Sequence, residues 1–119
     1  MSTQQIATRL ADLCNKGEFE TAQTELFADD AVSIERQATP QFPKETKGLK
    51  AILEKGHKWS AGIETLHSCS ASKPIVAGNA FALTLNMDVS FKGQGRMQLQ
   101  EICVYEVKDG KIASEQFFM

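Results

Sequence analysis

The stretch FALTLNMDVSF, residues 81–91, alternates apolar side chains with small or polar ones along its whole length. A period of two predicts a strand with one buried face and one exposed face. The Gly-Gln-Gly turn at residues 93–95 then leads into a second strand over residues 96–107. Asp109-Gly110 is a typical two-residue hairpin turn, so residues 111–119 predict a last antiparallel strand.

Further strands are indicated upstream and at the end of this meander. Residues 63–73 predict one strand, which Pro74 ends, and residues 32–35 alternate as a short strand does. Residues 37–47 are polar and contain two prolines, which indicates a loop. The last strand carries Phe117 and Phe118 side by side. We expect this strand to be central or covered, because an exposed apolar edge invites aggregation.

Apolar residues recur at helical spacing in three N-terminal segments. The first segment begins at a capping box of Ser2 and Gln5 and ends at Gly17. The second runs from Glu18 to about Phe27, and the third covers residues 49–59. Helices followed by a meander of strands predict an α+β fold with the helices on one face of the sheet.

The length and composition of the chain indicate a single domain and argue against nucleic-acid-binding and membrane-spanning proteins. The chain has 119 residues, the size of one domain, and we expect a single domain over residues 1–119. A net charge of -2 and the lack of a basic cluster argue against a nucleic-acid partner. No apolar run approaches the length of a membrane span, so we expect no membrane partner. An odd number of widely spaced cysteines and the lack of a secretory pattern predict free thiols in a cytoplasmic protein.

Two segments carry a resemblance to a known family. Residues 26–32, Leu-Phe-Ala-Asp-Asp-Ala-Val, resemble the link from a helical hairpin to a first strand, and residues 104–112 resemble a closing hairpin. Gly48, at the start of the third predicted helix, also lies where the family often has a glycine. The chain thereby resembles SnoaL-like domains of the nuclear transport factor 2-like superfamily. The resemblance implies a cone, in which three N-terminal helices pack on a curved antiparallel sheet around a pocket.

Within that superfamily, the likeness to ketosteroid isomerases implies a carboxylate base at Glu35. The same comparison places Leu10 where those enzymes have a tyrosine donor, and Gln100 where they have a protonated acid. A leucine cannot donate a hydrogen bond and an amide replaces an acid only in part, so we do not expect steroid isomerase activity. Val32 and Ile34 occupy the strand face opposite Glu35. If these two residues line the pocket, Glu35 points away from it, and the alternative is a solvated Glu35 at a strand end.

Glu101 is the second candidate base. It shares its strand face with apolar neighbours such as Leu99 and Cys103, and burial there would raise its pKa into a useful range. The alternative is an ion pair, for example with Arg96, or a contact in a dimer. Gln100 and Glu101 are adjacent, so both cannot face one pocket unless a bulge intervenes.

The remaining candidates are histidines and aromatic residues. His57 at the end of the third helix and His67 on a strand are candidate proton donors, or structural histidines. Trp59 and Phe117 are expected to form part of the pocket wall, unless they only fill the core. No HxxxH motif or Cys/His cluster is present, so we expect no metal site. No glycine-rich phosphate-binding motif is present either, and we expect no cofactor.

Two functions remain open at this point. The chain is either an isomerase-like or cyclase-like enzyme, with Glu35 or Glu101 as base and Gln100, His57 or His67 as donor, or a non-catalytic module. The ligand expected in both cases is a small apolar molecule, and for the enzyme it is a carbonyl compound. The module would pair as a homodimer through the outer face of the sheet. That face presents small polar residues on the central strand: Thr84, Asn86, Asp88 and Ser90.

Overall fold

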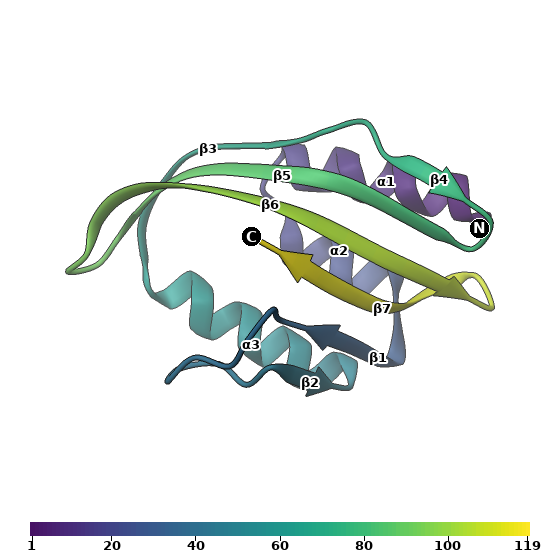
Figure 1. The fold of residues 1–119 in the computed structure, drawn as a ribbon, viewed down its shortest axis with the longest axis horizontal. Coiled ribbons are helices and arrows are strands. Elements are labelled where there is room, and N and C mark those ends of the chain that lie inside the picture. Colours follow the sequence, from purple (N-terminus) through teal and green to yellow (C-terminus); the bar gives the residue numbers. More distant parts are fainter.

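The structure, a computed structural model, describes residues 1–119 and contains three helices and seven strands (Figure 1). The helices are α1 (Thr3–Asn15), α2 (Phe19–Leu26) and α3 (Leu49–Ala61). The strands are β1 (Phe27–Ile34), β2 (Glu45–Lys47), β3 (Ile63–Ala71), β4 (Ile75–Ala77), β5 (Ala80–Phe91), β6 (Gly95–Lys108) and β7 (Lys111–Phe118). The predicted α+β class and the three predicted helices are confirmed.

The strands form one curved sheet in the order β2-β1-β7-β6-β5-β3, with β4 paired to β5 (Figure 1). The meander predicted from the sequence is antiparallel throughout, from β3 through β5 and β6 to β7. β1 pairs with β7 in parallel, so the sheet is mixed and not wholly antiparallel. β7 lies between β1 and β6, which confirms that the strand with the two adjacent phenylalanines is central.

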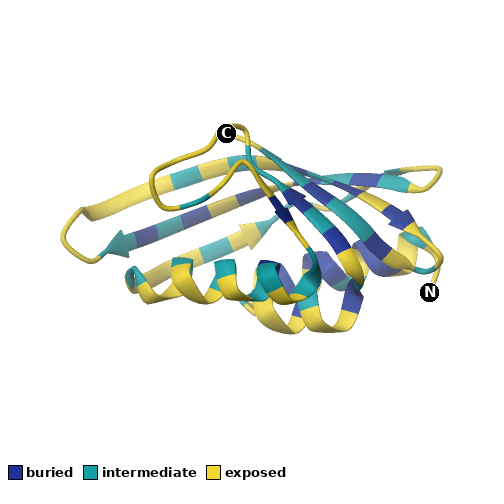
Figure 2. Cartoon of the chain, turned by 90° about the horizontal axis from the view of Figure 1, so that it is seen from below, coloured by how far each residue is buried: buried dark blue, intermediate teal, exposed yellow.

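The helices cover one face of the sheet, and the core lies between the two layers (Figure 2). On β5 the alternation seen in the sequence becomes alternation of burial, with Phe81, Leu83 and Leu85 facing the helices. α1 starts at the predicted capping box, where Ser2 Oγ accepts from the Gln5 backbone N–H at 3.1 Å. The apolar stripe of α1 is buried against the sheet, as its period requires. None of the three helices is both long enough and apolar enough to cross a membrane.

Three local features differ from the sequence prediction. Residues 45–47 form β2 inside the predicted loop, and residues 75–77 form β4. Both strands have three residues, too few for a period of two to be visible. Residues 28–31, which interrupt the pattern, belong to β1, whose register with β7 shifts between Phe27 and Val32. Such an irregularity displaces the alternation that a regular strand would show.

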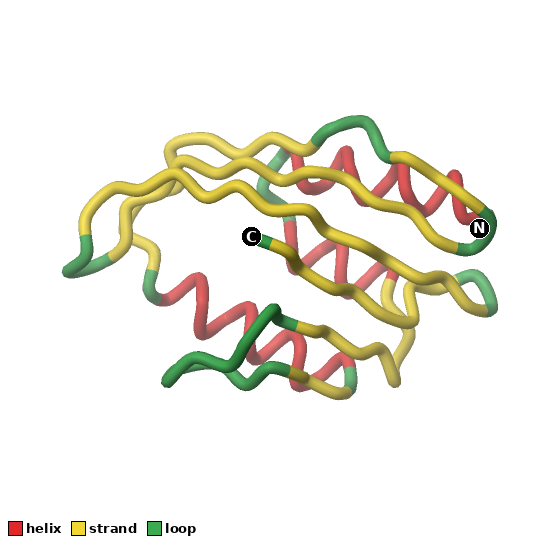
Figure 3. The backbone as a smooth tube through the Cα atoms, in the orientation of Figure 1, coloured by secondary structure: helices red, strands yellow, loops and turns green.

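The segment between β1 and β2, residues 35–44, is a loop that runs beside α3 (Figure 3). Lys58 of α3 holds it, because its Nζ donates to the Gln41 carbonyl at 2.6 Å and lies 5.2 Å from the centre of the Phe42 ring. This anchored loop and α3 together form one margin of the space between the helices and the sheet.

Candidate functional site

A cavity of about 340 Å³ lies between the helices and the inner face of the sheet. Its volume is at the lower end of the usual range for ligand pockets, roughly 300–1,000 Å³. Apolar side chains from every layer line it, among them Leu10, Phe27, Leu85 and Leu99. Exposed residues such as Thr39 also line it, so the cavity opens to solvent beside the loop of residues 35–44.

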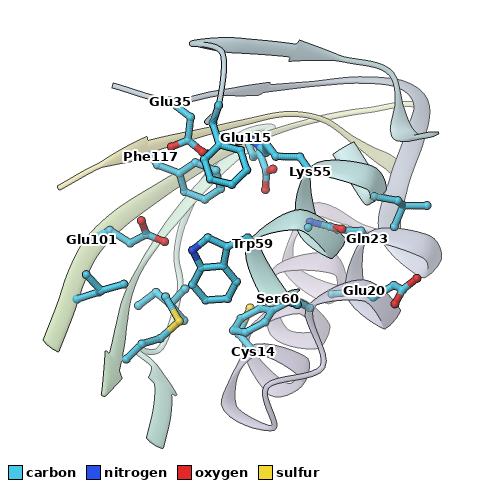
Figure 4. Close-up of a pocket in the computed structure, with 18 of the residues that line it drawn as sticks. Cys14, Glu20, Gln23, Glu35, Lys55, Trp59, Ser60, Glu101, Glu115 and Phe117 are labelled. Atoms are coloured by element: carbon cyan, nitrogen blue, oxygen red, sulfur yellow. Dashed lines mark hydrogen bonds and ion pairs between the residues drawn. The ribbon is translucent and has the colours of Figure 1, made fainter. Parts of the chain in front are cut away.

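One end of the cavity holds charged and polar side chains from four elements (Figure 4). Lys55 Nζ of α3 donates to Ser33 Oγ at 2.7 Å and lies 3.3 Å from Glu35 Oε1. Glu115 comes from β7 and Glu101 from β6, and both carboxyl groups point toward the interior in Figure 4. Three carboxyl groups and a single lysine thus line the cavity together, and only Glu35 pairs with that lysine.

Strand pairing explains why these residues meet. Ser33 on β1 and Glu115 on β7 are direct partners in the parallel pair, and Glu115 in turn faces Tyr105 on β6. Because neighbouring residues in register point to the same face, all three side chains are directed toward the helices. β6 pairs with β5 without interruption from Gly95 to Glu106, so Glu101 keeps the same inward direction as Tyr105.

Glu115 is the most buried acid of the cluster, with only 3% of its surface exposed. Burial raises the pKa of its carboxyl to about 7. A hydrogen bond from Ser33 and the positive charge of Lys55 lower the pKa, but by less than burial raises it. The neighbouring charges of Glu35 and Glu101 raise the pKa further. Its Oε2 atom has no hydrogen-bond partner in the protein. Buried polar atoms in folded proteins almost always have a hydrogen-bond partner, either in the protein or in ordered water.

Glu101 lies on the apolar wall formed by β6. Burial raises the pKa of its carboxyl to about 7, a hydrogen bond from Cys103 lowers it, and the charge of Glu35 raises it. In that hydrogen bond Cys103 Sγ donates to Glu101 Oε1 at 3.6 Å. The Glu101 carboxyl is therefore divided between its acid and base forms near neutral pH, the condition that suits a group that both accepts and returns a proton.

The candidate residues predicted from the sequence do not all lie in the cavity. Glu35, Glu101, Trp59 and Phe117 line the cavity, and Glu35 faces inward because Val32 and Ile34 take the other strand face. No bulge intervenes at Gln100, which lines a shallow groove away from the cavity.

The two histidines lie apart from the buried carboxyl groups. His57 borders the cavity at its mouth, where its Nε2 is 2.8 Å from Glu20 Oε1 and the side chain is 62% exposed. His67 is exposed on β3, and its Nε2 is 2.7 Å from Ser90 Oγ. Neither ring reaches the polar end of the cavity, whereas Lys55 and Glu115 do. No group of three or more His, Cys, Asp or Glu side chains is arranged to hold a metal ion.

The sequence reasoning missed Ser33, Lys55 and Glu115. Glu115 had a signal, since it alternates with Phe117 on a strand expected to be central. Lys55 lies four residues before Trp59 and therefore on the same side of α3. A lysine on a helix is usually solvated, so only the packing of α3 on β1 reveals it as part of the cavity.

Comparison with known proteins gives a family and several similar structures. The model of the SnoaL-like domain family matches residues 1–119. A Mesorhizobium loti protein described as a SnoaL-like polyketide cyclase is 32% identical, with each chain fully covered and a TM-score of 0.92. No curated protein matches the chain.

Two further structures share the fold at low identity. A nuclear transport factor 2-like protein from Burkholderia thailandensis has a TM-score of 0.83 at 13% identity, covering 99% of this chain and 90% of its own. A protein of unknown function with a cystatin-like fold, from Xanthomonas campestris, has a TM-score of 0.81 at 16% identity, covering 99% and 90%. These two likenesses show the fold alone.

Proposed function

This chain belongs to the SnoaL-like domain family, and on that premise we propose that it is a cofactor-free acid–base catalyst acting on a small, largely apolar carbonyl compound. The observation that carries the proposal is Glu101, a carboxyl group on the apolar wall of the cavity whose pKa lies at about 7. A general base is most effective when its pKa is close to the working pH.

In the proposed reaction the Glu101 carboxylate removes a proton from the carbon next to the carbonyl. The electron pair of the broken C–H bond forms a C=C bond, and the π pair of the carbonyl moves onto its oxygen, which gives an enolate. In an isomerisation the substrate is an unsaturated ketone, and protonated Glu101 returns the proton to the far carbon of the dienolate. In a cyclisation the enolate carbon attacks a second carbonyl of the same substrate. The isomerisation regenerates the Glu101 carboxylate directly. The cyclisation regenerates it when protonated Glu101 passes its proton to the new alkoxide.

Lys55 is the group that we assign to the enolate oxygen. An ammonium group has three N–H donors, and Lys55 uses two of them on Ser33 and Glu35. The third is free for an oxygen in the cavity, where a positive charge stabilises the developing enolate. Lys55 therefore replaces the amide or histidine donor expected from the sequence, because Gln100 and His67 lie outside the cavity and His57 lies at its mouth.

Deuterium incorporation from D₂O into a panel of small cyclic and open-chain ketones, followed by proton NMR, tests the proposal. We expect at least one ketone to exchange faster with the protein than in buffer. Glu101→Gln should slow that exchange roughly a hundredfold to ten-thousandfold. Glu106→Gln, an exposed carboxyl on the same strand, should not change the rate. Exchange that survives intact in Glu101→Gln would show the assignment of the base to be wrong.

A second candidate function is that of a non-catalytic homodimeric binding module. Ile102 and Phe118 are direct cross-strand partners on the outer face of the sheet, and they are 50% and 43% exposed. Thr84 lies next to Ile102 on the same face. We propose a second copy of the chain as the occupant of this face. Sedimentation equilibrium should then show a dimer at micromolar concentration that Ile102→Lys dissociates; a monomer at all concentrations would contradict it.

A further inference from the structure

More carboxyl groups than basic side chains line the cavity. Glu20 pairs with His57 at the mouth, and Glu35 pairs with Lys55 inside, at 2.8 and 3.3 Å. Glu101 and Glu115 also line the cavity, but neither forms an ion pair with any residue of the chain. The interior therefore contains two carboxyl groups, Glu101 and Glu115, that pair with no cation of the chain, and both carry negative charge above about pH 7.

Glu115 supplies an independent indication of a ligand. Its side chain is almost fully buried, it points into the cavity in Figure 4, and its Oε2 atom has no hydrogen-bond partner. Lys55 does not fill this role, because no hydrogen bond joins its Nζ atom to Glu115 Oε2. A donor that enters from the cavity would complete the oxygen, and a cationic donor would also offset the excess negative charge.

Aromatic rings line the same space. Trp59 stands between Glu101 and the helices in Figure 4, and edge-on contacts hold its ring against Phe19 at 6.4 Å and Phe91 at 6.1 Å between ring centres. The ring of Phe117 already makes a cation–π contact, because Lys55 Nζ lies 5.7 Å from its centre. Aromatic faces attract cations, most strongly where water is excluded.

We propose that the cavity binds a small organic cation, an amine in its protonated form, with its ammonium group between Glu101 and Glu115 and its apolar body against Trp59. An anionic ligand is disfavoured because it would meet uncompensated carboxylates. The inference concerns the ligand of the same cavity and does not rest on the proton transfer proposed above.

The proposal makes binding depend on pH in a defined direction. Both carboxyl groups gain negative charge as pH rises through about 7, because burial raises the pKa of each. Cation binding should therefore strengthen over the same interval. Besides the two carboxyls themselves, the titratable and charged groups that face them come from five elements or their ends: Glu35, Lys55, Cys14, Cys69, Cys103 and Tyr105. Of these, only Lys55 is cationic, and it is already paired.

Benzylamine and benzyl alcohol form a matched pair of probes, since they share a ring and differ in charge. Isothermal titration calorimetry should show benzylamine binding at least about tenfold more tightly near pH 8 than near pH 6, with benzyl alcohol weaker near pH 8 and indifferent to pH. Glu115→Gln should weaken benzylamine binding roughly tenfold to a hundredfold near pH 8. The exposed control Glu106→Gln should bind benzylamine as the parent does.

Two outcomes would overturn the proposal. One is benzyl alcohol binding as tightly as benzylamine near pH 8. The other is unchanged benzylamine affinity in both Glu101→Gln and Glu115→Gln, with circular dichroism showing both variants folded. Because the readout is equilibrium binding, failure here is separable from failure of the ketone exchange assay: a protein that exchanges ketones without binding amines loses only the present inference.

Discussion

Replacing Glu115 by glutamine should stabilise the protein at alkaline pH. The carboxyl group has an ordinary pKa of 4.5 and a folded-state pKa of about 7, raised by burial. Glutamine has nearly the same shape and never ionises, so the change removes the cost of charging this buried position. The exposed fraction of Glu115 is only 3%, so solvent does little to screen the effect.

The magnitude follows from the two pKa values. A rise from 4.5 to about 7 corresponds to about 3 kcal/mol, at roughly 1.4 kcal/mol for each tenfold change in the ionisation constant. An acid whose pKa is higher in the folded state binds more protons there. Its contribution to stability is therefore complete below pH 4.5, falls as pH rises toward about 7, and stays lost above that value.

Urea unfolding at about pH 4 and about pH 8 measures the effect. The free energy of unfolding of Glu115→Gln, relative to the parent, should increase by about 3 kcal/mol between the two conditions. Glu106→Gln, at an exposed position, serves as the control: its free energy of unfolding relative to the parent should be the same at both pH values. If Glu115→Gln shifts stability equally at both pH values, the Glu115 carboxyl is not destabilised by burial and the account of this residue fails.

Further predictions address the rest of the cavity. Lys55→Met should lower the free energy of unfolding by roughly 1–3 kcal/mol near neutral pH, because Glu35 loses its ion-pair partner; urea unfolding measures it, and an unchanged midpoint would argue against the pair. Trp59→Ala should cost roughly 3 kcal/mol in the same assay, since the ring fills the space between Phe19 and Phe91. Cys14 should react slowly with a thiol reagent in the folded protein and quickly in urea, because burial raises its pKa to about 12. Rapid native labelling of Cys14, located by mass spectrometry, would contradict its buried position.

The meander and the three helices could be predicted because their signals are local. Alternation over residues 81–91 fixes which face of β5 is buried, and the capping box at Ser2 fixes where α1 begins. The parallel pairing of β1 with β7 could not be predicted in this way. It joins residues about eighty positions apart, such as Ser33 and Glu115, and no local pattern specifies a partner at that distance.

The candidate site was predicted in the same uneven manner. Glu101 could be found because an acid in an apolar strand pattern stands out, and uninterrupted pairing of β6 with β5 places it in the cavity and Gln100 outside. Lys55 and Glu115 could not be recognised as neighbours, since they meet only through the packing of α3 on β1 and the pairing of β1 with β7. Sequence patterns identify the face of an element, whereas a site depends on which faces meet.

The central claim is that Glu101 accepts and returns a proton near neutral pH. Carbon-13 NMR of the side-chain carboxyl groups over the range from about pH 4 to about pH 9 measures this without a substrate. We predict a resonance that titrates near pH 7 and disappears in Glu101→Gln, while the resonance of Glu115 remains. Titration of every glutamate near the ordinary value of about 4.3 would contradict the account.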